Sequence, residues 1–66
     1  MQITVNGETR TYTNPLTLLG LLEVLGVNPK SVVVERNLRI VDRSQVESEM
    51  IEDGDNIEII RFVGGG

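Results

Sequence analysis

Apolar residues recur along the chain with two different periods, which predict strands toward both ends and one helix between them. Ile3 and Val5 alternate with polar residues, and the Asn-Gly dipeptide at 6–7 favours a tight hairpin turn because both positions tolerate positive φ. Residues 8–13 are rich in Thr and predict the second arm of that hairpin, with one face toward water. The Asn-Pro dipeptide at 14–15 then ends the pairing.

A leucine stripe predicts one short helix. Its members follow the i, i+3, i+4, i+7 spacing of a single helix face and are Leu18, Leu21, Leu22 and Leu25. Thr17 precedes the stripe as an N-cap, and Gly26 follows it as a C-cap. Gly20 inside the helix costs about 0.8–1.0 kcal/mol relative to Ala, so we expect close packing to require a small residue there.

The second half of the chain predicts three further strand segments. The β-branched run at 32–34 is typical of a central strand, and a short strand at 40–41 follows it. Residues 42–49 have no clean period, so we interpret them as a loop with one helical turn. Residues 57–62 alternate after a turn at 53–55 and form the last strand.

The order strand, strand, helix, strand, short strand, strand predicts an α+β fold of the β-grasp or ubiquitin-like class. A mixed sheet of four to five strands would pack on one main helix. A right-handed crossover would place the final strand centrally, beside the first. We expect this β-grasp domain to span residues 1–63.

The last strand also predicts a partner-docking patch. Alternation turns Ile57 and Ile59 toward the helix, and it turns Ile60 and Phe62 outward. These two exposed residues, continued by Val63, form the predicted patch. The alternative is that isolated apolar residues on a sheet surface have no function.

Composition limits the chemistry that the chain can perform by itself. Its 66 residues include no Cys and no His, which removes thiolate nucleophiles, imidazole bases and the usual zinc ligands. Ten acidic and six basic residues give a net charge of −4, so we expect neither nucleic acid nor a membrane as a partner. No leader pattern is present, and no apolar run reaches the roughly 18 residues of a bilayer span, so we expect a soluble cytoplasmic protein.

Acidic residues gather between positions 47 and 55. Asp53 and Asp55 flank Gly54, and two carboxylates are too few for calcium, so we interpret this segment as a turn and expect no metal. The acidic stretch as a whole consists of Glu47, Glu49, Glu52 and the nearby aspartates. Its simplest interpretation is a solvated surface, and the alternative is contact with a basic face of a partner enzyme.

Three glycines end the sequence, and we expect them to be a flexible tail and the functional site. Gly64, Gly65 and Gly66 offer no side chain to a core but provide a thin, extendable strip of backbone. Such a strip can pass through an enzyme channel that any Cβ would block, and it can present the carboxylate of Gly66 to a catalytic site on another protein. A frayed terminus without function is the alternative.

Several segments resemble the sulfur carrier proteins of thiamine biosynthesis. The resemblance spans nearly the whole chain and includes the Glu-Arg-Asn turn at 35–37, the Asp-Gly-Asp turn at 53–55 and the Phe-Val-Gly-Gly-Gly ending at 62–66. Two positions depart from the family pattern: Leu38 stands where Gly is usual, and Asp42 stands where Pro is common. Because Leu is awkward at a positive-φ position, we expect a longer or different loop in this hairpin.

The resemblance implies a carrier that is a protein substrate and not an enzyme. Its Gly66 would be adenylated with ATP by an enzyme related to the ubiquitin-activating type, after Gly64 and Gly65 thread the channel of that enzyme. A sulfur donor protein would convert the acyl-adenylate to a thiocarboxylate, and thiazole synthase would take the sulfur to build the thiazole ring. No bound cofactor is implied, because the activating partner consumes the ATP.

Three other functions share this fold and stay open at this point. They are the small subunit of molybdopterin synthase, a ubiquitin-like modifier that forms isopeptide bonds to lysines, and a non-covalent β-grasp interaction module. The short length and the ending at 62–64 favour the thiamine branch, because the molybdopterin family tends to be longer, with prolines before the tail.

Overall fold

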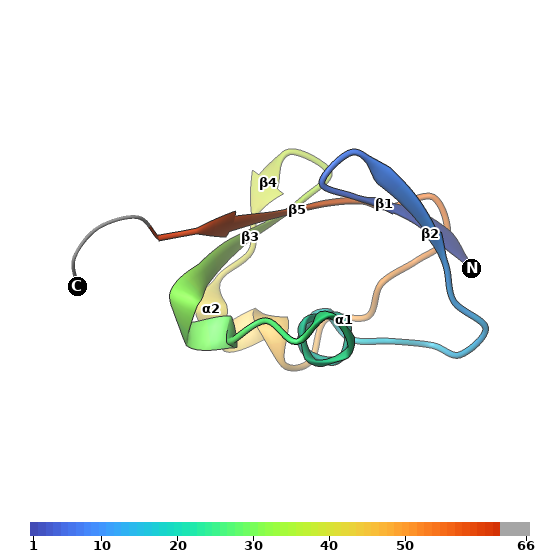
Figure 1. Ribbon diagram of the computed structural model, residues 1–66. Helices are drawn as coiled ribbons and strands as arrows, with labels where there is room; N and C mark the ends of the chain where they lie inside the picture. Colours follow the sequence, from blue (N-terminus) through green and yellow to red (C-terminus); the bar gives the residue numbers. More distant parts are fainter. Residues whose placement is uncertain (63–66) are drawn as a thin grey trace.

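The computed structural model describes residues 1–62, which form a five-stranded sheet packed on one main helix (Figure 1). In chain order the elements are β1 (Gln2–Val5), β2 (Glu8–Thr11), α1 (Leu18–Leu25), the 3-10 turn η1 (Pro29–Ser31), β3 (Val32–Arg36), β4 (Arg39–Ile40), α2 (Arg43–Val46) and β5 (Asn56–Arg61). The strand order is β2-β1-β5-β3-β4. This is the predicted β-grasp architecture.

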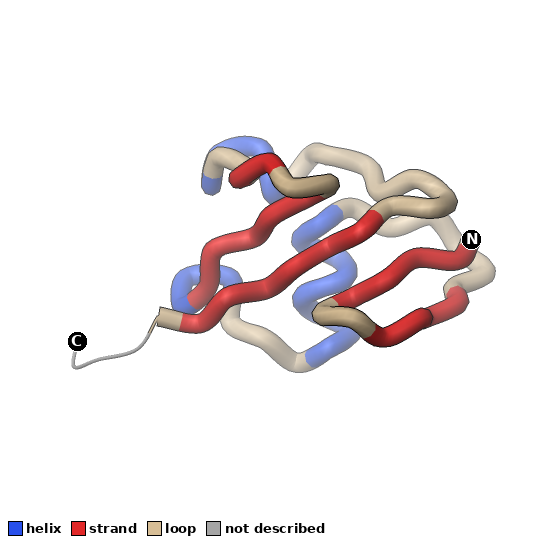
Figure 2. The backbone as a smooth tube through the Cα atoms, turned by 90° about the horizontal axis from the view of Figure 1, so that it is seen from above, coloured by secondary structure: helices blue, strands red, loops and turns tan. Residues whose placement is uncertain are grey.

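The last strand lies in the centre of the sheet, as the crossover argument predicts. β5 is parallel to β1 and antiparallel to β3. Figure 2, seen from above, shows α1 crossing behind the strands, so the helix covers one face of the sheet. Figure 1 shows α2 on that same side. Within residues 1–62, no helix covers the opposite face.

The first hairpin closes through the predicted Asn-Gly turn. Asn6 has φ 48° and Gly7 has φ 83°, so both central positions are left-handed, as in a two-residue hairpin turn that follows the sheet twist. The register pairs Val5 with Glu8 directly across this turn. β2 ends at Thr11, two residues before the predicted end, and leads to the Asn-Pro break.

Both caps of α1 are confirmed. The hydroxyl of Thr17 accepts a hydrogen bond from the Gly20 N–H at 3.0 Å, and Gly26 adopts φ 72° at the C-terminal end. A Cβ at Gly20 would lie 3.3 Å from Thr17 Oγ1 and 3.4 Å from Leu16 Cδ2. The small residue therefore leaves room for the N-cap, which gives the expected packing reason for its presence.

The β3–β4 turn overturns one expectation. Arg36 pairs directly with Arg39, so the loop contains only two residues, and Leu38 accepts φ 70° after Asn37 at φ 51°. The expectation of a longer or different loop is therefore wrong. Asn37 is bound from outside the hairpin, because its Oδ1 accepts the Asn56 N–H at 2.9 Å. Leu38 itself is 82% exposed, so its side chain meets little steric resistance.

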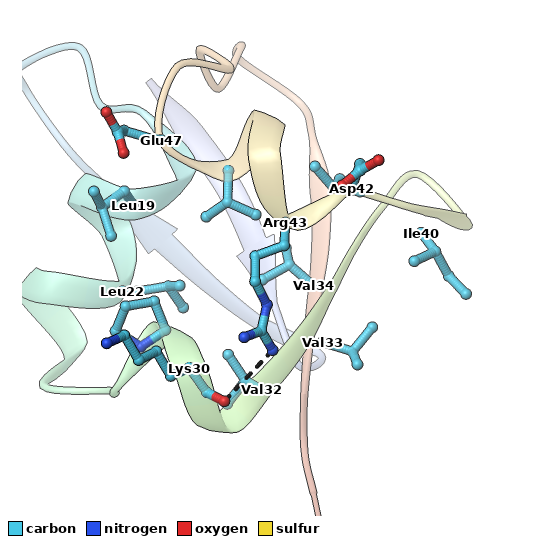
Figure 3. A pocket seen from close by; sticks show the side chains of 13 residues that line it. Leu19, Leu22, Lys30, Val32, Val33, Val34, Ile40, Asp42, Arg43 and Glu47 are labelled. Atoms are coloured by element: carbon cyan, nitrogen blue, oxygen red, sulfur yellow. Dashed lines mark hydrogen bonds between the residues drawn. The ribbon is translucent and has the colours of Figure 1, made fainter.

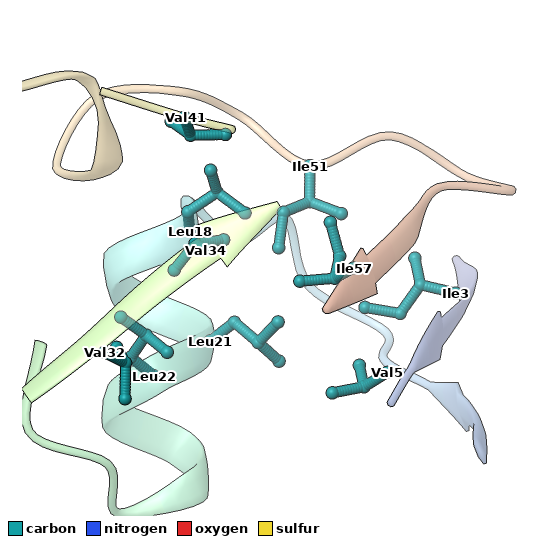
Figure 4. Close-up of a cluster of buried hydrophobic side chains, with 10 residues drawn as sticks. All are labelled: Ile3, Val5, Leu18, Leu21, Leu22, Val32, Val34, Val41, Ile51 and Ile57. Carbon is teal, nitrogen blue, oxygen red and sulfur yellow. The ribbon is translucent and has the colours of Figure 1, made fainter. Parts of the chain in front are cut away.

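The hydrophobic core fills the space between the sheet and α1 (Figure 4). Its buried members are Ile3, Val5, Leu18, Leu21, Leu22, Val32, Val34, Val41, Ile51 and Ile57. Three of the four stripe leucines are fully buried, and Leu25 packs at the margin. The leucine period and the strand alternation therefore meet in one core, as the sequence pattern predicts.

Candidate functional site

The predicted reactive residue, Gly66, and the predicted threading residues, Gly64 and Gly65, lie outside the described residues, as does Val63 of the docking patch. The structure describes the chain up to Phe62. The Phe62 N–H donates to the Ser31 carbonyl at 3.0 Å, so the chain is held beside η1 directly after β5. In Figure 1 the end of β5 lies on the opposite side of the domain from the N-terminus.

The predicted alternation along the last strand is confirmed. Ile57 is completely buried and Ile59 packs against the core, whereas Ile60 is 45% and Phe62 is 58% exposed. We call the sheet face turned away from α1 the outer face, and its strand residues on β3, β4 and β5 are Val33, Glu35, Ile40, Asn56, Glu58 and Ile60. The two described members of the predicted docking patch are therefore accessible.

An asparagine clasp supports the strand that carries this patch. β1 pairs with β5 only as far as Val5 and Ile57. Beyond that point the Asn6 side chain continues the ladder, because its Oδ1 accepts the Ile59 N–H at 2.7 Å and its Nδ2 donates to the Ile59 carbonyl at 3.4 Å. Sequence reasoning identified Asn6 as a turn residue and missed this second role, which depends on a contact 53 positions away.

A second finding corrects part of the interpretation of the acidic stretch as a solvated surface: Glu47, Glu52 and Asp53 are exposed, but Asp55 is buried and Glu49 is half-buried. Three of its carboxylates surround one guanidinium, that of Arg36, and we call these four residues the Arg36 cluster. The Arg36 guanidinium lies 2.7 Å from Asp55 Oδ2, 3.3 Å from Glu52 Oε1 and 3.5 Å from Glu49 Oε1. The side chains of Arg36 and Asp55 are only 11% and 9% exposed, so this pair is largely removed from water.

Asp55 is stabilised in its charged form by these surroundings. Burial acts to raise the pKa of its carboxyl, but hydrogen bonds from the Glu52 N–H at 2.8 Å and Asn37 Nδ2 at 3.0 Å, together with the Arg36 guanidinium, outweigh burial and lower the pKa below its ordinary value of 3.8. The Asp-Gly-Asp segment is therefore a structural anchor for β3 and β5, beyond the turn that the sequence predicts.

The turn assignment itself is confirmed. Gly54 has φ 88°, and Asp53 Oδ1 accepts the Gln2 N–H at 2.6 Å. Among the described residues, no group of three or more acidic, Cys or His side chains is arranged to hold a metal ion. No helix in this part of the chain is long and apolar enough to cross a bilayer.

A groove of about 480 Å³ opens between α1, α2 and β3 (Figure 3). Its wall is largely aliphatic and includes Leu19, Leu22, Val32, Val34, Val41 and Val46. Lys30 and Arg43 line the rim, where the Arg43 guanidinium donates to the Lys30 carbonyl at 3.5 Å. Val33 and Ile40, which also belong to the outer face, line the edge of this groove, whereas Ile60 and Phe62 do not.

The sequence of this chain matches one protein family and several known proteins. The model of the ThiS family matches residues 3–66. A thiazole synthase of Paramagnetospirillum magneticum is 44% identical over all 66 residues, and the chain spans 20% of that protein's length. The sulfur carrier protein ThiS of Bacillus subtilis is 40% identical over 50 residues, which cover 76% of each protein.

A solved structure shows the same fold over the full length. The crystal structure of a thiamine biosynthesis protein (ThiS) from Geobacter metallireducens superposes with a TM-score of 0.86 at 35% identity and covers 100% of both chains. The family match, the structural match and the β-grasp topology lead to one assignment. The chain belongs to the ThiS family, the thiamine sulfur carriers that its turns and glycine ending resemble.

Proposed function

We propose that this chain carries sulfur for thiamine biosynthesis as a thiocarboxylate on Gly66. The observation that carries the proposal is the family match through residue 66, which includes the three terminal glycines together with the whole β-grasp domain. ThiS proteins are named as sulfur carriers and as thiamine biosynthesis proteins among the matches. The match to this family favours the thiamine pathway over that of molybdopterin.

The Gly66 carboxylate is converted to a thiocarboxylate in two steps. An oxygen of the Gly66 carboxylate attacks the α-phosphorus of ATP, pyrophosphate leaves, and an acyl-adenylate forms. Sulfur at the oxidation level of sulfide, delivered by the donor protein, then attacks the acyl carbon; the bond to AMP breaks, AMP leaves with the electron pair, and a thiocarboxylate and a proton remain. A carboxylate is a poor acyl donor until its oxygen becomes a good leaving group, and a chain without Cys or His relies on a partner enzyme for this chemistry.

The described domain supplies the binding surface for these reactions. Ile60 and Phe62 present apolar area directly before the tail, and Val63 continues the docking patch in sequence. Gly64 and Gly65 act as the spacer that reaches the catalytic centre of the activating enzyme. ATP belongs to that enzyme and is consumed there.

Thiazole synthase is the proposed acceptor of the sulfur. Two thiazole synthases, from Paramagnetospirillum magneticum and Magnetococcus marinus, each contain a segment that is 44% or 41% identical to this chain. The chain spans 20% of the length of each. A carrier segment and the enzyme in one polypeptide would meet at a high effective concentration, which supports a direct partnership.

Intact mass spectrometry tests the proposed function. The protein ending at Gly66 is incubated with ATP, the activating enzyme of the same organism and a sulfur source. Replacement of one carboxylate oxygen by sulfur should add about 16 Da. The same protein without Gly65 and Gly66 is the control and should gain no mass. An unchanged mass of the full chain with an active enzyme contradicts the proposal.

A further inference from the structure

Two charged residues lie on the outer face of the described strands, and both are negative. Glu35 of β3 and Glu58 of β5 are directly opposite each other in the antiparallel register. Directly opposite residues have Cβ atoms about 4.5–5.5 Å apart, and like charges in such a pair destabilise a sheet. Glu58 is exposed and Glu35 is half-buried. The pair therefore opposes folding of the free protein.

No cation of the described strands offsets this repulsion. Three other charged strand residues lie on the helix side of the sheet, because each is paired in the register with a buried core residue. They are Glu8, Arg10 and Arg61, which lie opposite Val5, Ile3 and Val32. Arg36 and Arg39 pair with each other, and both contact Glu49. Among residues 1–62, the ion pairs involve Arg36 and Arg39 and include neither Glu35 nor Glu58.

Apolar side chains flank the carboxylate pair. Val33 and Ile60, two positions along from the two glutamates, are themselves register partners. Ile40 lies opposite Glu35 on its other side and is 69% exposed. Figure 3 shows Val33 and Ile40 pointing away from Leu22 of α1. The outer face thus combines exposed apolar area with a local negative charge that lacks a partner within the described chain.

We propose that the outer face docks on thiazole synthase and that Glu35 and Glu58 together bind one arginine of that enzyme. The inference rests on the proposed function and adds the chemistry of the partner surface. A guanidinium presents several N–H donors in a plane and can bridge two carboxylates, so its charge would relieve their repulsion only in the complex. Exposed Ile60 and Ile40 would contact apolar side chains around that arginine. Thiazole synthase is the occupant because relatives join this enzyme to a similar segment.

Affinity and stability should change in opposite directions when the charges are removed. The variants Glu35→Gln and Glu58→Gln, singly and combined, are titrated against thiazole synthase of the same organism by calorimetry. The double variant should bind about tenfold more weakly or worse, with a smaller salt dependence of Kd. Its Tm should rise by about 1–4 °C, because the repulsion in the free protein disappears. Glu23→Gln, the same change on an exposed residue of α1, should alter neither quantity.

A charge reversal provides the second variant. Glu58→Lys should form a pair with Glu35, raise Tm and abolish binding to thiazole synthase, whereas a purely structural role would not separate these effects. Unchanged affinity of the double glutamine variant for thiazole synthase overturns the inference. A parallel titration against the activating enzyme, in which only the affinity for that enzyme falls, overturns it as well. If the unmodified protein gains about 16 Da while these variants bind normally, the proposed function stands and the docking inference fails. If it gains no mass, the proposed function fails whatever the affinities are.

Discussion

Ile59 and Phe62 are three positions apart on the same stretch of chain and belong to opposite sides of the sheet. Ile59 packs against the core, and its backbone is clasped by Asn6. Phe62 is 58% exposed, although its N–H is bound to Ser31. We therefore expect this exposed aromatic ring to contribute more to the proposed partner recognition than to folding.

Truncation of these two side chains should therefore separate binding from stability. Phe62→Ala should weaken binding to the activating enzyme or to thiazole synthase by about 1–3 kcal/mol and reduce the free energy of unfolding by less than about 1 kcal/mol. Ile59→Ala should cost about 2–4 kcal/mol of unfolding free energy, because it leaves a cavity beside Ile57 and the core. Urea unfolding and partner titrations measure both effects, with Val24→Ala on the exposed side of α1 as the control. A larger stability loss in Phe62→Ala than in Ile59→Ala would contradict this assignment of faces.

The two hairpins of the sheet use the same turn geometry with different residues. Asn6-Gly7 and Asn37-Leu38 both have two positive φ values, and both asparagines bind backbone groups outside their own hairpin. Gly accepts the second position without strain, whereas a left-handed residue with a Cβ costs about 1–2 kcal/mol. The β3–β4 hairpin therefore retains a local cost that the β1–β2 hairpin avoids.

Exchanging the residue at the second turn position should reveal this cost. Leu38→Gly should raise the free energy of unfolding by about 0.5–1 kcal/mol, because relief of strain exceeds the added freedom of the unfolded chain. Gly7→Ala should lower it by about 1–2 kcal/mol, and since an added Cβ would meet no atom within 4 Å, the loss is conformational and not steric. Urea unfolding with an unchanged m value would attribute both effects to stability. A stability loss in Leu38→Gly would show that the exposed leucine makes contacts worth more than its strain.

At the level of the whole molecule, periodic patterns predicted the fold and local chemistry predicted most turns. The leucine stripe, the Val run at 32–34 and the alternation after Ile57 each carry enough apolar residues to define a face. The Arg36 cluster was not predictable in this way, because it joins residues up to 19 positions apart. In the sequence these charged residues cannot be distinguished from ordinary surface residues. The Asn6 clasp was not predictable for the same reason, because its partner, Ile59, lies beside Asn6 only after the crossover has placed β5 next to β1.

The Arg36 cluster connects β3, its turn and the segment that leads into β5, so it ties together parts of the chain that meet only in the folded state. Asp55 has a pKa below its ordinary value of 3.8 in the folded protein, and the unfolded chain binds its proton more readily. Its contribution to stability is therefore complete at neutral pH. It is lost as the pH falls below the ordinary value and through the lowered one.

Asp55→Asn should expose this contribution. At pH 7 the variant should lose about 1–3 kcal/mol of unfolding free energy, because Arg36 keeps its buried charge without its closest partner. Below the ordinary carboxyl pKa of 3.8 the two stability curves should converge, since acid removes the same charge from the unmodified protein. Urea unfolding at a series of pH values measures the difference, and Glu23→Gln on the exposed side of α1 should follow the unmodified curve throughout. Parallel curves for Asp55→Asn and the unmodified protein from neutral to acid pH would mean that the carboxylate charge contributes nothing and that the cluster is held by its neutral hydrogen bonds alone.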